Sequence, residues 1–130
     1  MMFDSSRAVL GAWIKGVNSG EIESVIGLYH NDAVLLPTFS NRTMASPEAI
    51  KDYFAQLGAR EGLVVELHES TLRRQRYADH IEGVMGIYRW RFEVEQEALS
   101  FEARFTYFID LSSATPILHH HSSQVPRDLS

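Results

Sequence analysis

The sequence contains no cysteine, no long hydrophobic run and no long run of basic residues. Without cysteine, the chain can form neither a disulfide framework nor a thiolate metal site, and it has no cysteine nucleophile. The N-terminus lacks the basic start and the continuous apolar block of a signal peptide, and no run reaches the length of a membrane span. These absences favour a cytoplasmic protein that has no membrane partner.

Basic residues are fewer than acidic residues in this chain. The chain has 12 Lys and Arg against 17 Asp and Glu, which gives a net charge of -5. Because nucleic-acid-binding proteins usually carry a basic stripe, we expect no nucleic-acid partner. The 130 residues, 45% of them hydrophobic, fit one domain with a core over about 5–124 and a polar tail over 125–130.

The first half of the chain carries three helix patterns separated by turn residues. Apolar residues, Trp13 among them, recur at helical spacing after a run of capping residues. A second, short pattern spans residues 21–29, and residues 33–36 form a short apolar strand. Ser46-Pro47-Glu48 combines a capping side chain with a proline suited to the first helical position, so it predicts a third helix, which ends at Gly58.

From residue 62 onward the hydrophobic period changes from helical to two. Residues 63–73, 78–92 and the segments on either side of 112–114 therefore predict long antiparallel strands. Helices followed by such a sheet indicate an α+β domain. We expect the helices to cover one face of a strongly curved sheet, so that the domain is cone-shaped and encloses a cavity.

The strand expected over residues 101–109 has two different faces. Its odd-numbered residues are apolar and share one face, whereas Glu102 and Arg104 lie on the other. Phe108 and Leu118 make this second face partly apolar too. We therefore predict that both faces are covered and that an arginine and a carboxylate line a pocket.

Five parts of the chain resemble a known fold: Trp13, LYHNDAVLLPTFSN (28–41), AIKDYF (49–54), ARFTYF (103–108) and LHHHSSQVP (118–126). Over residues 8–126 the chain resembles the nuclear transport factor 2-like fold. Within it, the chain is similar to bacterial proteins grouped with the calcium/calmodulin-dependent protein kinase II association domain and with SnoaL-like proteins. The resemblance implies a pocket inside the cone and a homodimer or higher homo-oligomer formed through the outer sheet face.

The same resemblance assigns roles to particular residues. Arg104 matches an arginine that the kinase association domain places in its pocket, while Ser122 stands where a second pocket arginine would be. Matching Ser122 in this way puts His120 inside the cone. His119 and His121 then lie on the outer face, at a subunit interface.

Arg104 is the main candidate for ligand binding. Its guanidinium, beside Glu102, could bind a carboxylate or phosphate, or the two residues could form a buried structural pair. Tyr88, Trp13 and Phe39 are candidate aromatic lining residues, and ordinary core packing is the alternative.

Candidates for catalysis and metal binding are fewer. His120 could act as a general base, and Asp32 resembles the acids that SnoaL-like isomerases use, although an acid at this position also suits a turn. His119 and His121 could ligate a metal with His68 or Glu66, or form hydrogen bonds in an interface. We expect neither a metal nor a cofactor.

Two functions follow from these observations. The first is an oligomerising domain that binds a small organic ligand, anionic if Arg104 contacts it. The alternative is a cofactor-free SnoaL-like enzyme that carries out isomerase, cyclase or hydratase chemistry.

Overall fold

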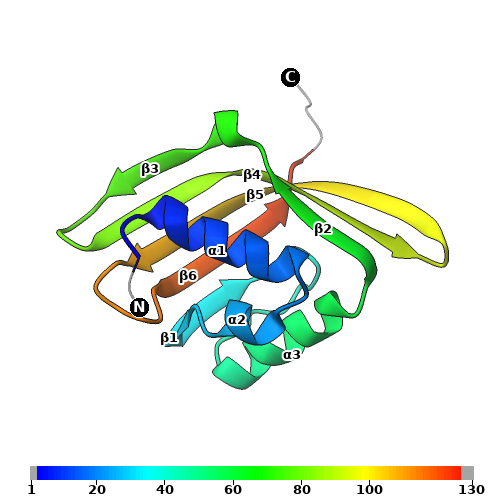
Figure 1. Cartoon of the computed structure of the whole chain (residues 1–130), viewed down its shortest axis with the longest axis horizontal. Helices are drawn as coiled ribbons and strands as arrows, with labels where there is room; N and C mark the ends of the chain where they lie inside the picture. Colours follow the sequence, from blue (N-terminus) through cyan, green and yellow to red (C-terminus); the bar gives the residue numbers. More distant parts are fainter. Residues whose placement is uncertain (1–2, 127–130) are drawn as a thin grey trace.

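The computed structural model describes residues 3–126, in which helices pack on one face of a curved six-stranded sheet that does not close (Figure 1). This arrangement confirms the expected α+β class. The helices are α1 Ser6–Asn18, α2 Ile22–Ile26 and α3 Pro47–Gly58, and a 3-10 turn, η1, spans Glu69–Thr71. The strands are β1 Tyr29–Leu36, β2 Glu61–Leu67, β3 Arg73–Arg76, β4 Ile81–Val94, β5 Glu97–Asp110 and β6 Ile117–Gln124.

The two longer helices begin where the capping residues predict. The Ser5 hydroxyl accepts a hydrogen bond from the Ala8 amide (3.1 Å), and the Ser46 hydroxyl accepts one from the Ala49 amide (3.2 Å). Each bond satisfies an amide that has no partner within its own helix. Pro47 occupies the start of α3, where its missing N–H costs nothing.

The strands are ordered β1-β6-β5-β4-β2 across the sheet, and β3 also pairs with β4. β4, β5 and β6 form the expected antiparallel meander, while β1 runs parallel to β6. The turn between β4 and β5 falls at Glu95 and Gln96, whose φ angles of 52° and 68° match the primed hairpin turns. Figure 1 shows this hairpin extending beyond the helices.

Two element boundaries differ from the expectation. α2 ends at Ile26, and Tyr29 begins β1 instead of ending a helix, because β6 supplies a parallel partner from Ile117 onward. The strand expected over 63–73 is divided by η1. There the Thr71 hydroxyl donates to the His68 carbonyl (2.7 Å) and accepts from the Ile87 amide (2.9 Å), so the chain turns before β3 begins.

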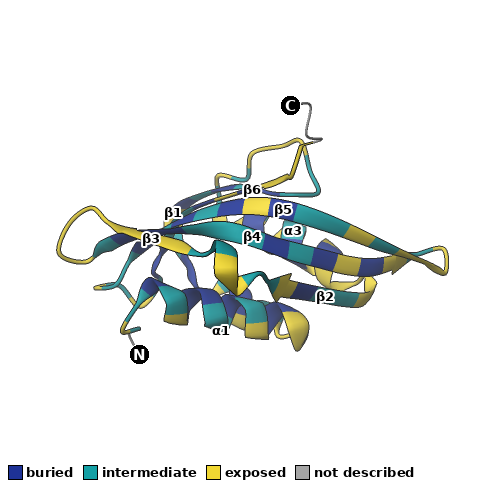
Figure 2. Ribbon diagram, turned by 90° about the horizontal axis from the view of Figure 1, so that it is seen from above, coloured by how far each residue is buried: buried dark blue, intermediate teal, exposed yellow. Residues whose placement is uncertain are grey.

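The core lies between the helices and the concave face of the sheet (Figure 2). Trp13 of α1 is fully buried at its centre and stacks on Tyr88 with ring centroids 5.7 Å apart. Along β5 the odd-numbered residues face this core, as the sequence predicts. The buried side chains of the sheet are mostly large, so the interior of the cone is crowded.

No helix within residues 3–126 is both long and apolar enough to cross a membrane. Residues 127–130 of the expected polar tail lie outside the described part of the chain.

Candidate functional site

A chain of hydrogen bonds joins four buried side chains inside the cone. The Trp13 indole N–H donates to the Tyr29 hydroxyl (3.0 Å), and that hydroxyl lies 2.7 Å from His120 Nδ1. On the other side of the ring, His120 Nε2 lies 3.1 Å from the Tyr88 hydroxyl. The imidazole also stacks on Tyr107, with centroids 3.8 Å apart. Three strands and one helix thus fix the orientation of His120.

The direction of these bonds follows from counting donors. Tyr29 already accepts from Trp13, so its own hydrogen can be donated to His120 Nδ1. His120 then carries its proton on Nε2 and donates to the Tyr88 oxygen. This assignment lets the Tyr88 hydroxyl hydrogen turn toward the neighbouring hydroxyl groups of Ser122, Tyr107 and Thr38. The opposite assignment would leave the Tyr29 hydrogen without a partner.

Burial keeps this cluster uncharged. It lowers the pKa of His120 well below the ordinary value, and the nearby His119 and His121 lower it further. Burial also raises the pKa values of Tyr29, Tyr88 and Tyr107 above the usual range for tyrosine. At neutral pH this cluster therefore offers neutral donors and acceptors.

The space beside His120 is small. The interior cavity measures about 10 Å³, which matches a single water molecule. Ser122, which lies inside the cone as expected, hydrogen-bonds through its hydroxyl to Thr38 at the edge of this space. The deep pocket expected inside the cone is therefore filled by side chains in this structure.

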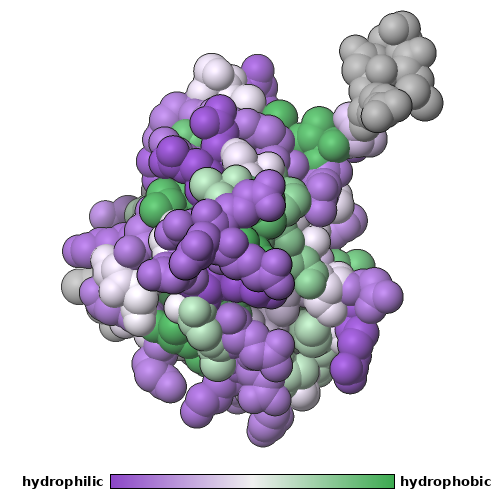
Figure 3. All heavy atoms as spheres, turned by 90° about the vertical axis from the view of Figure 1, so that its right-hand side faces the viewer, coloured by the Kyte–Doolittle hydropathy of each residue, from purple (hydrophilic) through white to green (hydrophobic). Residues whose placement is uncertain are grey.

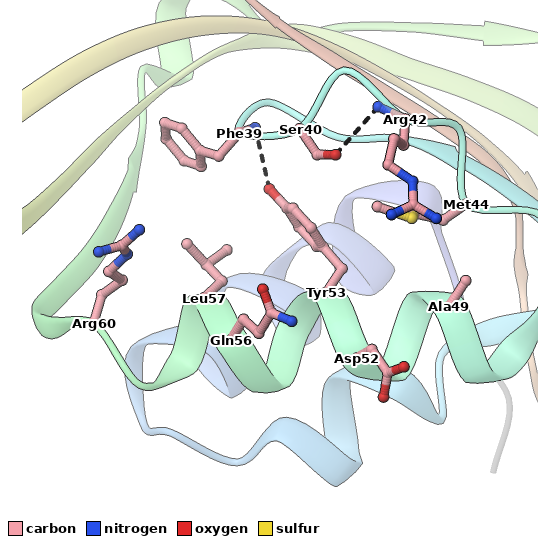
Figure 4. Close-up of a pocket in the computed structure, with 10 residues that line it drawn as sticks. All are labelled: Phe39, Ser40, Arg42, Met44, Ala49, Asp52, Tyr53, Gln56, Leu57 and Arg60. Carbon is pink, nitrogen blue, oxygen red and sulfur yellow. Dashed lines mark hydrogen bonds between the residues drawn. The ribbon is translucent and has the colours of Figure 1, made fainter.

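Larger hollows lie at the mouth of the cone, beside the loop of residues 37–46 that joins β1 to α3. One of about 360 Å³ lies between this loop and α3, with Arg42 and Arg60 at its two ends and Tyr53 between them (Figure 4). A second, of about 620 Å³, lies on the side of Phe92 and Phe101. Small-molecule sites are commonly concave spaces of about 300–1,000 Å³.

Phe39 forms a wall shared by both hollows. Its ring packs edge-on against Trp90, Phe92 and Phe101, with centroid distances of 5.6, 5.2 and 5.3 Å. Its backbone amide donates to the Tyr53 hydroxyl (3.3 Å), a bond drawn in Figure 4. Phe39 thus anchors the loop on the aromatic side chains of β4 and β5.

No protein-family model matches this sequence, and no curated protein matches it. Solved structures do match. A Xanthomonas campestris protein with the provisional name calcium/calmodulin-dependent protein kinase II association domain is similar over 94% of this chain and 86% of its own, with a TM-score of 0.83 and 26% identity. A nuclear transport factor 2-like protein of unknown function from Pseudomonas putida is similar over 95% of this chain and 86% of its own (TM-score 0.75, 18% identity). The chain has the nuclear transport factor 2-like fold.

A third similar structure, from Novosphingobium aromaticivorans, has the provisional name scytalone dehydratase. The similarity extends over 92% of this chain and 81% of the Novosphingobium chain, with a TM-score of 0.79 and 8% identity. The nuclear transport factor 2-like fold expected from the sequence is thereby confirmed.

In this nuclear transport factor 2-like domain, Arg104 does not face the interior. It is exposed on the convex face of the sheet, because its neighbours Ala103 and Phe105 take the inward positions of β5. The prediction that Arg104 lines the cone is therefore wrong. Glu102 is likewise outside, where it pairs with Arg89 (3.0 Å) and His68 (2.7 Å).

Two hydrogen-bonded partners on the convex face keep Glu102 ionised. Burial acts to raise the pKa of Glu102, but hydrogen bonds from Arg89 and His68 outweigh it, so the pKa lies below the ordinary value. From the sequence, an ion pair between Glu102 and Arg104 was the structural alternative to ligand binding by Arg104. The partners are instead a β4 arginine and a histidine that follows β2.

The remaining candidate residues lie either in the interior of the cone or on the outer surface of the domain. Tyr88 and Trp13 are fully buried, and both line the small interior cavity, as expected. His119 is half-buried and His121 exposed on the convex face. β5 and β4 separate them from His68 and Glu66, the metal ligands considered from sequence. Asp32 is exposed on β1 and lines none of the hollows described above.

Sequence reasoning missed the arginines at the mouth. Arg60 lies two residues after the end of α3, and Arg42 lies in the loop before the helix. A basic residue just past a helix end interacts favourably with the helix dipole, so such a position by itself indicates no ligand. Only the folded loop shows that both residues border one hollow.

Proposed function

We propose that this domain binds a small organic molecule with an anionic group at the mouth of the cone. The observation that carries the proposal is that two guanidinium groups, from Arg42 and Arg60, border one hollow of about 360 Å³. Within residues 3–126 neither forms an ion pair. Guanidinium groups suit carboxylate and phosphate oxygens, which they can bind through two parallel hydrogen bonds.

The rest of the hollow suits the organic part of such a ligand. Phe39, Tyr53 and Leu57 supply apolar surface, and Gln56 adds a polar group that could orient the ligand. Asp52, the carboxylate at the rim, points away from the loop in Figure 4. Apolar walls with a few polar groups are typical of small-molecule sites.

Removal of either mouth arginine should weaken binding of a model anion. We expect Arg42→Ala and Arg60→Ala each to raise the dissociation constant for benzoate by about fivefold or more, since each loses a charge-assisted hydrogen bond that solvent exposure weakens. Binding can be followed by chemical-shift changes in labelled protein. Arg104→Ala is the matched control, because it removes an exposed arginine from the convex face and should leave benzoate binding unchanged. Equal affinities in all four proteins would disprove the proposed site.

The domain is also proposed to form a homodimer through the convex face of the sheet. Half-buried apolar residues lie there beside His119 and His121, namely Val34, Leu36, Met85, Ile87 and Phe108. In contrast, the end of the molecule that carries the β4–β5 hairpin is mainly hydrophilic (Figure 3). The assembly role in the name of the Xanthomonas protein supports the same proposal.

Carboxylates placed on this face should disrupt the dimer. We expect the double variant His119→Asp, His121→Asp to shift sedimentation from dimer toward monomer, because like charges would meet and be desolvated at the interface. The control, Lys15→Asp with Ala55→Asp, puts two carboxylates on exposed positions of α1 and α3 instead. A histidine variant that sediments as the control does would remove these residues from the interface.

An enzyme is the second candidate, favoured by the interior hydrogen-bond chain. A neutral His120 that donates to Tyr88 would let the Tyr88 hydroxyl polarise a carbonyl group, and the dehydratase name of the Novosphingobium protein fits such chemistry. Proton abstraction also needs a base. No carboxylate lines the interior cavity among the described residues, and both nitrogens of His120 are hydrogen-bonded. Binding is therefore the better-supported function.

A further inference from the structure

The hollow of about 360 Å³ runs along one face of α3. The helix residues that line it include Ala49, Tyr53, Gln56 and Leu57, whose three- and four-residue spacing places their side chains on one face of the helix. An α-helix rises about 1.5 Å per residue, so this face extends roughly 12 Å from Ala49 to Leu57. The hollow can therefore hold an extended ligand that lies parallel to the helix.

The two mouth arginines lie at opposite ends of this face (Figure 4). Arg42 belongs to the loop and lies at the Ala49 end, whereas Arg60 lies beyond Leu57, two residues after α3 ends. The central carbon of the Arg60 guanidinium is 5.6 Å from the centroid of the Phe92 ring, a distance typical of a cation–π contact. This contact favours a position of Arg60 at its own end of the hollow, away from Arg42.

The lining between the two arginines carries little charge. Among the described residues that line the hollow, Asp52 alone has a carboxylate, and its side chain points away from the loop in Figure 4. The ring of Tyr53 and the side chain of Leu57 supply apolar surface, and Gln56 adds a neutral amide. Two separated cations with mainly apolar surface between them are complementary to a ligand that is anionic at both ends.

We propose that the ligand of this hollow is a dicarboxylate with an apolar middle. One carboxylate pairs with Arg42 and the other with Arg60, while the middle lies along Tyr53 and Leu57. Each guanidinium suits a carboxylate because it can form two parallel hydrogen bonds with it. This inference rests on the proposed function for the hollow itself, and it adds a second anionic group and the direction in which the ligand lies.

Three simple acids test the inference. Octanoate and suberate have carbon chains of the same length, but suberate has a carboxylate at both ends, and succinate has two carboxylates on a short chain. Suberate should bind about tenfold more tightly than octanoate at low salt, because its second carboxylate pairs with the arginine that octanoate leaves free. Succinate should bind more weakly than suberate, since its carboxylates lie too close together to reach both ends of the hollow.

Chemical-shift changes in labelled protein give the three dissociation constants. Added salt should reduce the advantage of suberate over octanoate, because both arginines are exposed to solvent. Equal affinities for octanoate and suberate would overturn the inference. Succinate that binds as tightly as suberate would overturn it too, since the affinity would then depend on charge alone and not on two separate ends.

Single-arginine variants test whether both ends are used. Arg42→Ala and Arg60→Ala should each reduce the affinity for suberate to about that for octanoate, whereas Arg42→Lys should keep part of the advantage because it keeps the charge. Arg104→Ala, on the convex face, is the matched control and should keep the full advantage. An advantage that survives the removal of either mouth arginine would show that the second carboxylate binds elsewhere, which overturns the inference.

The two proposals fail separately. Arginine-dependent benzoate binding with no advantage of suberate over octanoate removes only the dicarboxylate. Benzoate binding that is independent of Arg42 and Arg60 removes the proposed function, while the advantage of suberate and its loss in the arginine variants still decide the dicarboxylate on their own.

Discussion

Acidification from pH 6.5 to pH 5 should lower the free energy of unfolding by about 1.5 to 2 kcal/mol, because His120 is held neutral in the fold. Burial, with the nearby His119 and His121, keeps the pKa of the folded His120 well below its ordinary value of 6.5. In the unfolded chain the same side chain binds a proton near pH 6.5. Over this range the unfolded state therefore binds more protons, so stability falls as pH falls.

The acidic groups contribute little to the loss of stability between pH 6.5 and pH 5. Glu82, Glu102 and Asp110 also have pKa values below their ordinary range. Their stabilising contribution is present above the unfolded pKa values of 4.5 and 3.8, and it is lost only below them. A loss that begins at pH 6.5 therefore reports histidine.

Urea unfolding at half-unit steps of pH measures how steeply the free energy of unfolding changes with pH. His120→Gln should remove most of it, since glutamine keeps a donor and an acceptor but does not titrate. His119→Gln is the matched control, because burial and His121 lower the pKa of His119 too, yet that residue is only half-buried. A wild-type slope in the His120 variant would show that the imidazole is not held neutral.

The helices and the antiparallel meander were predictable because local sequence patterns indicate them. Ser46 and Pro47 begin α3 through the first free amides of the helix, and the alternation of apolar residues aligns β5 with β6. The strand β1 was harder to predict. Its pairing with β6 is a contact between distant parts of the chain, and local pattern did not indicate that Tyr29 would leave the helix.

Arg104 shows where the candidate site failed. The observed register pairs Arg104 with Ser123 and Phe105 with Ser122, so Arg104 and Ser122 lie on opposite faces. Strict alternation from the buried Phe105 would have placed the arginine outside. The prediction instead followed the family resemblance for both Arg104 and Ser122, and the observed register does not allow both residues to face the interior.

The interior cluster was only partly predictable for a related reason. Alternation correctly turns His120 inward, but its two partners come from β1 and β4. The mouth hollow depends on the path of the loop over residues 37–46, which no periodicity describes. Sequence thus indicated the inward residues of single strands and could not assemble sites from several elements.

The largest effect is expected at the centre of the core: Trp13→Ala should lower the free energy of unfolding by about 3 to 5 kcal/mol. Trp13 is fully buried and contacts five rings, those of Phe54, Tyr88, Trp90, Tyr107 and His120. Its removal leaves a cavity between α1 and the sheet that the surrounding side chains cannot fill. Urea unfolding at pH 7 measures the loss.

A pair of conservative variants separates packing from hydrogen bonding. Trp13→Phe and Trp90→Phe remove the same atoms from two buried indoles, but only Trp13 uses its N–H. Trp13→Phe also leaves the Tyr29 hydroxyl without its donor, so it should cost about 1 kcal/mol more than Trp90→Phe. Equal costs would mean that the Trp13–Tyr29 bond contributes nothing to stability, which would remove the basis for the direction assigned to the bond between Tyr29 and His120.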